Sequence, residues 1–283
     1  GSALGFLLGG MILKAWGWEA AFYVCGVPGL LLAVTCLFIE EPARAVASVR
    51  VPIAESMLTL AKVPLYRRVV LGYICHTAAV GAFSYWAPSF LSMRYGMELS
   101  SASFWFGVVT VAAGAIATLA GGAMTDAAQR RIDVQGGAAD LRDRRAIGAM
   151  LKLCGLGLYI AAPATLLLAF MPTVPTFFVV AFVAEIGVFL STAPVNVATL
   201  RAVPPAMRAS AMAVSIFAIH IFGDIWSPPA LGGLIDVLPL AAAMMFLPIV
   251  FAIGAFVWWP RKHEIETAAA TVPAARIVAG GDA

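Results

Sequence analysis

Two titratable residues, His220 and Asp224, lie four residues apart inside a long apolar run, VPPAMRASAMAVSIFAIHIFGDIWSPPALGGLID. This spacing places an imidazole and a carboxylate on one face of a helix, where they can contact each other. Such groups are costly inside a membrane and normally face a bundle interior or a wet cavity, often on the path of a substrate or proton. The plainer interpretation is a helix stabilised by a buried polar pair.

Two further titratable residues lie deep in apolar runs. At 1.5 Å per residue, His76 lies ~12 Å from one membrane face, Glu185 ~16 Å from the other and His220 ~18 Å from the first. No Lys or Arg lies within four residues of Glu185, and a carboxylate in apolar surroundings can carry a proton near neutral pH. His76 fits a hydrogen-bonded core histidine equally well. We expect a substrate or proton site near the bilayer midplane.

Three less specific polar residues complete this candidate site. Ser84 and Trp86 belong to a polar and aromatic segment that ends at Pro88. This segment could line a pocket for a lipid-like or aromatic ligand, although an interfacial aromatic girdle explains Trp86 nearly as well. Asn196 follows Pro194, and it could simply cap or kink its helix.

The composition is that of an integral membrane protein. Hydrophobic residues make up 62% of the chain and charged residues 12%, whereas soluble domains are about a quarter charged. The apolar runs are long and continuous rather than alternating, which favours membrane helices over a β-barrel. The four cysteines lie far apart, with no CxxC spacing and no neighbouring histidine. We therefore expect no disulfide framework, no metal site and no cofactor.

Eight membrane spans are predicted, at 1–15, 20–39, 69–92, 103–124, 146–170, 174–195, 207–230 and 238–259. Residues 1–39 form a first pair of spans, and 40–68 form a linker with a short interfacial helix at 54–62. Residues 69–259 form a six-helix unit, and 260–283 form a polar, disordered tail. A polar loop at 125–145 joins the fourth and fifth spans.

The basic residues set the predicted orientation. With the two long loops, the 201–208 loop and the tail on one side, that side holds all but two of the 18 Lys and Arg residues, and Lys14 and Arg94 lie opposite. By the positive-inside rule, the crowded side is cytosolic. We expect a multi-pass protein of a bacterial inner membrane with its C-terminus in the cytosol.

Enzyme signatures are absent from the sequence. No HExxH, GxSxG or GxxxxGK[ST] pattern occurs. The spacing of His220 and Asp224 is one residue short of the HxxxxD of acyltransferases. The lack of a phosphate-cradling loop argues against an ATP-driven pump, and we expect no enzymatic activity.

The segment GGAMTDAAQRR resembles the loop motif of the major facilitator superfamily, usually written GxLxDRxGRR. Gly122, Asp126, Arg130 and Arg131 match this motif, whereas Ala127 replaces its first Arg. The carboxylate lies four and five residues before the two guanidinium groups, which suits a conformational latch. Ordinary positive-inside charge, with an Asp that ends the helix, explains the same residues.

Within the superfamily, the chain resembles the Spinster-like transporters, most clearly in STAPVNVATLRAVPPAMRASAMA and IHIFGDIWSPPALGGLID. The resemblance implies an all-α membrane protein with two six-helix halves around a central cavity. The eight spans would correspond to family helices five to twelve, and upstream helices of the same protein would complete the first half. The third, fourth, sixth and seventh spans would line or gate the cavity, and the fifth and eighth would be peripheral.

These observations predict a secondary transporter that works by alternating access. We expect proton coupling and an amphipathic lipid substrate, such as sphingosine phosphate or a lysophospholipid, with the bilayer as surroundings and no nucleic-acid partner. The first alternative is a permease for a small organic acid or drug, which an Arg or Lys in the visible cavity would favour, and none is seen there. The second is a membrane-embedded lipid enzyme or a non-transporting receptor.

Overall fold

The computed structural model describes residues 9, 11–12, 15–39 and 53–261 of the chain. Every regular element among these residues is helical, and seven helical segments are long and apolar enough to cross a membrane. They correspond to seven of the eight predicted spans. The predicted span 1–15 lies mostly outside the described residues, as do the first part of the linker, 40–52, and nearly all of the tail.

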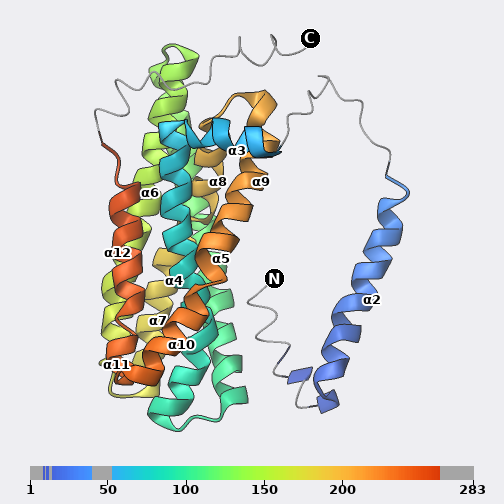
Figure 1. Cartoon of the computed structure of the whole chain (residues 1–283), viewed down its shortest axis with the longest axis vertical. Coiled ribbons are helices and arrows are strands. Elements are labelled where there is room, and N and C mark those ends of the chain that lie inside the picture. Colours follow the sequence, from blue (N-terminus) through green and yellow to red (C-terminus); the bar gives the residue numbers. More distant parts are fainter. Residues whose placement is uncertain (1–8, 10, 13–14, 40–52, 262–283) are drawn as a thin grey trace. The chain divides into compact units, whose positions relative to one another are not determined.

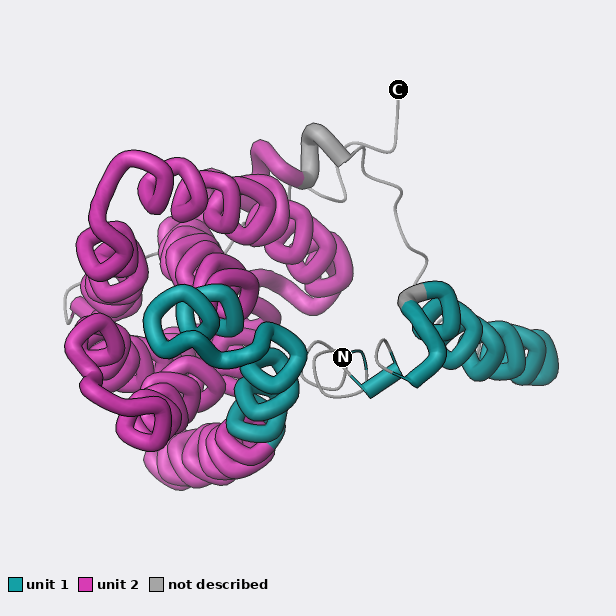
Figure 2. The backbone as a smooth tube through the Cα atoms, turned by 90° about the horizontal axis from the view of Figure 1, so that it is seen from below, with its two compact units in different colours: residues 1–50, 88–111 teal, residues 51–87, 112–283 magenta. Residues whose placement is uncertain are grey.

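The chain divides into two compact units, which Figure 2 shows in different colours. The first unit comprises residues 1–50 and 88–111. It contains α2 (Trp18–Cys36), an apolar helix with a single acidic residue, Glu19, in its first turn. It also contains the turn between α4 (Pro64–Tyr95) and α5 (Leu99–Gln135), where Gly96 takes a positive φ of 67° that side chains other than glycine rarely adopt.

The second unit, residues 51–87 and 112–283, is a bundle of long helices (Figure 1). In it, α6 (Ala139–Leu168) packs against α7 (Val174–Phe189), α8 (Thr192–Arg201) and α12 (Phe246–Trp258). The helices α6 and α7 touch backbone to backbone, since a Cβ on Gly187 would lie 2.5 Å from the carbonyl oxygen of Gly157. Small residues permit such close approach in membranes, where packing rather than water drives helix association.

A seam between α4 and α12 closes another side of this unit. The fully buried Trp258 ring covers Gly72, and its indole Nε1 donates a hydrogen bond to the carbonyl of Val69 at 3.0 Å. Arg68 donates to the carbonyls of Val257, at 2.6 Å, and Trp259. A guanidinium therefore satisfies carbonyls that the end of α12 leaves without helical partners.

The prediction of a polar loop at 125–145 is wrong, because most of these residues are helical. The helix α5 continues to Gln135 and α6 already begins at Ala139. Polar residues end the apolar run but not the helix, since they retain main-chain hydrogen bonds outside the membrane. The turn itself needs only Gly136 and Gly137, whose φ angles are 66° and 109°.

The linker region contains the short helix that the apolar spacing predicted. This helix, α3, runs from Ile53 to Ala61 and packs against α9 (Arg208–Ile219). The following helix, α4, begins at Pro64, five residues before the predicted span. A proline in the first turn lacks only an N–H group that would have no helical acceptor, so it fits the start of α4.

Two of the spans are interrupted inside the membrane segment. The span 174–201 consists of α7 and α8, with a turn at Leu190 and Ser191 between them. The span 205–237 consists of α9, the π-helical segment η2 (His220–Asp224) and α10 (Ser227–Val237). Prolines follow both interruptions, Pro194 in the first and Pro228 with Pro229 in the second. A proline removes one N–H donor from the helical ladder and thereby favours a break.

Candidate substrate and proton site

The predicted pair, His220 and Asp224, are the first and last residues of η2. The Nδ1 atom of His220 lies 2.9 and 3.1 Å from the two carboxylate oxygens of Asp224. A carboxylate only accepts hydrogen bonds, so Nδ1 donates and the other ring nitrogen, Nε2, is left to accept a proton. The side chain of His220 is 55% exposed and that of Asp224 31% exposed. The structure therefore confirms the contact, and it leaves both side chains partly exposed.

The backbone of η2 differs from an ordinary helix at this pair. The N–H of Ile225 bonds to the carbonyl of His220 at 3.2 Å, a bond that spans five residues. Isolated π-turns inside α-helices are rare, and they often occur at functional sites. The two titratable residues thus mark the first and last positions of an unusual backbone segment.

One face of this segment is fixed against α4 by glycines on both sides. A Cβ on Gly223 would lie 3.2 Å from the carbonyl oxygen of Ile74, and one on Gly81 would lie 2.7 Å from the Cβ of Asp224. Asp224 therefore stands directly against the α4 backbone. The sequence showed the glycines but not which helix they approach.

The α4 segment next to this contact contributes the predicted residues Ser84 and Trp86. The indole Nε1 of Trp86 donates to the carbonyl of Pro228 at 2.9 Å, and its ring lies over Gly232. Ser84 is half-buried, three residues after Gly81. The hydrogen bond to Pro228 gives Trp86 a packing role that an aromatic girdle alone would not explain.

Sequence reasoning missed Ser227, the first residue of α10. Its side chain is buried, and its Oγ has no hydrogen-bond partner among the described residues. It lies three residues after Asp224, and a Cβ on Gly81 would be 3.2 Å from this oxygen. A polar residue one helical turn beyond a membrane carboxylate, just before two prolines, was the signal for it.

Glu185 lies on the other interrupted span, and His76 contacts that span from α4. Glu185 is only 3% exposed on α7, three residues before Val188. The Nε2 of His76 donates to the carbonyl of Val188 at 3.2 Å, and its ring packs against Tyr73 and Trp258. His76 therefore contacts α7 and α12, and the described contacts do not bring it to His220 and Asp224.

The turn between α7 and α8 is closed by its own polar groups. The hydroxyl of Ser191 donates to the carbonyl of Val188 at 2.7 Å, the same oxygen that His76 contacts. Asn196 donates through Nδ2 to the carbonyl of Thr192 at 2.9 Å, within α8. The bond supports the interpretation of Asn196 as a residue that satisfies a broken helix.

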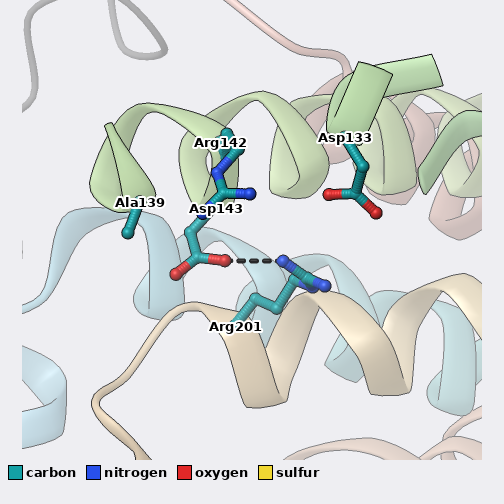
Figure 3. Close-up of a pocket in the computed structure, with 5 residues that line it drawn as sticks. All are labelled: Asp133, Ala139, Arg142, Asp143 and Arg201. Atoms are coloured by element: carbon teal, nitrogen blue, oxygen red, sulfur yellow. Dashed lines mark hydrogen bonds and ion pairs between the residues drawn. The ribbon is translucent and has the colours of Figure 1, made fainter. Parts of the chain in front are cut away.

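The predicted loop motif lies on the last turns of α5. Gly122 is partly buried, whereas Asp126, Arg130 and Arg131 are exposed. A nearby ion pair instead joins Arg201 at the end of α8 to Asp143 on α6, with 2.6 Å between Nη1 and Oδ1 (Figure 3). Sequence reasoning missed this pair, because its members are 58 residues apart and only the fold brings them together.

No group of three or more His, Cys, Asp or Glu side chains able to hold a metal ion occurs among the described residues. The contacts between His220 and Asp224 pair an imidazole with a carboxylate inside a described span. The arrangement can accept a proton or bind a polar headgroup, since it combines a hydrogen-bond donor, a carboxylate and an open imidazole nitrogen.

Comparisons with known proteins relate the chain to one family of transporters. A model of the Major Facilitator Superfamily matches residues 1–139. The chain is 30% identical over 257 residues to the Arabidopsis thaliana protein named "Probable sphingolipid transporter spinster homolog 2", covering 83% of this chain and 49% of that protein. It is 26% identical to the Danio rerio "Sphingosine-1-phosphate transporter SPNS2", covering 90% of this chain and 55% of that protein.

A solved structure shares the fold. The inward-facing, occupied form of a bacterial homolog to the human lysosomal transporter Spinster superposes with a TM-score of 0.60 at 19% identity, covering 91% of this chain and 64% of that one. The chain spans about half the length of the curated relatives. In sequence and in fold the chain is similar to Spinster-like transporters of the major facilitator superfamily, the resemblance that its sequence motifs predicted.

Proposed function

We propose that this chain is part of a secondary transporter that carries an amphipathic lipid by alternating access, driven by a proton gradient. The observation that carries the proposal is the His220–Asp224 pair in the π-segment of an interrupted span. Interrupted helices near the midplane are where many transporters hold substrates and coupling ions. The curated relatives named as sphingolipid transporters support the class of substrate.

In this proposal the proton binds to Nε2 of His220. The Asp224 carboxylate holds the Nδ1–H group, which fixes the ring orientation and leaves Nε2 as the basic atom. Proton uptake changes the pair from a net charge of −1 to zero. A neutral pair is less costly to move away from water than a charged one, so protonation would favour a conformation that withdraws the pair from an aqueous cavity.

Glu185 is the second proposed proton carrier. Its carboxyl group is buried in α7, one helical turn before the carbonyl of Val188 that marks the end of this helix. A buried acid exchanges protons only when a conformational change exposes it. Opening at the turn between α7 and α8 would provide that exposure.

The lipid headgroup would bind at His220 and Asp224, and Ser84 and Trp86 would line the same site from α4. A carboxylate next to an imidazole suits the ammonium and hydroxyl groups of a sphingoid base. The upstream helices of the full protein would supply the facing wall. The end of the bundle that carries the arginine-rich loops would face the cytosol of a bacterial inner membrane, together with the C-terminus.

The test is lipid uptake by the full-length protein in liposomes. A fluorescent sphingosine or lysolipid analogue is followed with and without an imposed pH gradient, in the unaltered protein and in Glu185→Gln. Uptake is expected to follow the gradient in the unaltered protein and to lose that dependence in the variant. Asp236→Asn is the matched control, because this exposed carboxylate lies at the far end of α10.

The other results would change the proposal in defined ways. Uptake that ignores the gradient would indicate a facilitator and would remove Glu185 from a proton pathway. The absence of lipid uptake, with uptake of a small organic acid instead, would establish the permease alternative. A C-terminal fusion to alkaline phosphatase tests the orientation, since this enzyme is active only outside the cytosol and should be inactive here.

A further inference from the structure

A polar pocket lies at the end of the second unit where α5 ends and α6 begins. Its volume is about 280 Å³, and it is lined by Asp133, Ala139, Arg142, Asp143 and Arg201 (Figure 3). The turn at Gly136 and Gly137 brings the last residues of α5 next to the first turn of α6. The pocket is therefore a product of this sharp turn and of the approach of α8 from below in Figure 3.

One side of the pocket is an ion pair that is already satisfied. Arg201 contacts Asp143 at 2.6 Å. With the amide of Gln129 turned so that its oxygen faces the guanidinium, this oxygen also accepts from Nη2 of Arg201 at 2.6 Å. The charges of Arg201 and Asp143 neutralise each other, so this side of the pocket does not require a charged ligand.

The two remaining charged residues of the lining have no such partner. Among the described residues, neither Asp133 nor Arg142 takes part in an ion pair, and Nε of Arg142 is buried without a hydrogen-bond acceptor. Figure 3 shows both side chains beside the Arg201–Asp143 pair, from α5 and α6 respectively. A buried donor left without an acceptor is costly, and a ligand that supplies the acceptor would relieve this cost.

Opposite charges on two walls restrict what can bind. A simple anion would meet Arg142 but would be repelled by Asp133, and a simple cation would face the reverse problem. A ligand that carries a positive and a negative group satisfies both walls with charge-assisted hydrogen bonds. The planar guanidinium can bind two phosphate oxygens at once, and a carboxylate accepts the hydrogen bonds of an ammonium group.

We propose that this pocket binds a phosphate ester that also carries an ammonium group, with the phosphate on Arg142 and the ammonium on Asp133. Arg142 lies four residues before the apolar run that starts at Ala146, hence about 6 Å outside it along the helix, which is the depth of phospholipid headgroups. The ligand therefore has two sources with the same chemistry, an ethanolamine phospholipid of the membrane and a soluble phosphoethanolamine. This site lies apart from His220 and Asp224 in sequence and in the described contacts.

The test measures ligand-induced thermal stabilisation of the full-length protein in detergent. Four probes are titrated: O-phosphoethanolamine, dihexanoyl phosphatidylethanolamine, dihexanoyl phosphatidylglycerol and glycine. The ethanolamine lipid should raise the melting temperature at lower concentration than the glycerol lipid, which lacks the ammonium group. In Arg142→Gln and in Asp133→Asn, the apparent Kd should rise about tenfold, as expected from losing one charge-assisted hydrogen bond.

Matched controls are Arg145→Gln on the same helix and Asp236→Asn on α10, which should bind the ethanolamine probes as the unaltered protein does. Stabilisation by soluble phosphoethanolamine as well as by the lipid would identify a soluble ligand, and stabilisation by the lipid alone would identify a membrane headgroup. The proposal is overturned if phosphatidylglycerol raises the melting temperature as much as the ethanolamine lipid, or if free glycine raises it as much as phosphoethanolamine. It is also overturned if neither variant weakens binding, or if no probe raises the melting temperature. Because this test measures binding and not uptake, a negative result here would not argue against proton-coupled transport.

Discussion

The two interrupted spans break their helices in different surroundings. Between α7 and α8, the turn at Leu190 and Ser191 is buried, and the carbonyl of Val188 accepts hydrogen bonds from His76 and Ser191. Between α9 and α10, the π-segment exposes more than half of the His220 side chain. One interruption is thus closed by protein groups, and the other leaves titratable atoms open.

This difference indicates that a broken membrane helix is not by itself a site. A break creates unsatisfied main-chain groups, and the protein must either satisfy them internally or leave them to water and ligands. Between α7 and α8 the break is sealed, since Gly187 packs on Gly157 and the carbonyl of Val188 has protein donors, and Glu185 beside it is buried. Where the break lies at an exposed surface of the bundle, the same polar residue types are available for chemistry.

The largest expected effect comes from overfilling the sealed break. Gly187→Val places a branched side chain where even a Cβ would lie 2.5 Å from the carbonyl oxygen of Gly157. We expect a loss of about 3 kcal/mol of stability, the upper end of common overpacking costs, measured as thermal unfolding in detergent. Gly233→Val is the control, because nothing lies within 4 Å of its Cβ position; equal loss in both would contradict the comparison.

At the open break, the expected effect is on transport rather than on folding. Asp224→Asn removes the charge that holds the Nδ1–H group of His220 and fixes its tautomer, so we expect gradient-driven uptake to fall about tenfold, the equivalent of about 1.4 kcal/mol. The melting temperature should change little, because the pair is partly exposed. A variant that unfolds but transports normally when folded would make this pair structural.

A substitution of His76 removes a hydrogen bond from the sealed break instead of overfilling it. His76→Leu removes the hydrogen bond to Val188 and should lower stability by about 1 kcal/mol, with unchanged uptake per folded molecule. His76→Gln retains a donor and should recover part of the stability. Loss of gradient dependence in a well-folded His76→Gln protein would instead add this histidine to the proton pathway.

The smallest expected effect lies at the far end of α8. Arg201→Asp breaks the ion pair with Asp143, and because both side chains are partly exposed, the loss should be about 1 kcal/mol or less. The double variant Arg201→Asp with Asp143→Arg should recover it, as measured by thermal unfolding. Failure of the exchange to recover stability would show that Gln129, rather than the opposite charge, holds Arg201.

The sequence predicted the membrane class, the family and seven of the observed spans, because long apolar runs specify membrane helices directly. It also predicted the contact between His220 and Asp224, which are local neighbours on one helix. It did not predict the helical continuation of α5 to Gln135, since a hydropathy pattern reports where the membrane ends and not where the helix ends.

The tertiary relations of the site were out of reach for a related reason. That His76 contacts Val188, or that Arg201 contacts Asp143, depends on which helices pack together and in which rotation. The π-turn at His220 was also hidden, because no residue type specifies it. In contrast, the possible kink near Asn196 and Pro194 was visible in the sequence, because proline disfavours a continuous helix.

The burial of Trp258 gives the protein an internal optical label. Trp105 and Trp226 are more than half exposed, whereas Trp258 is fully enclosed over Gly72. Lipids with brominated acyl chains quench indole fluorescence on contact. They should therefore quench Trp105 and Trp226 but not Trp258. The emission that Trp258 retains would then report on the seam between α4 and α12, and a motion that separates these helices would shift its wavelength.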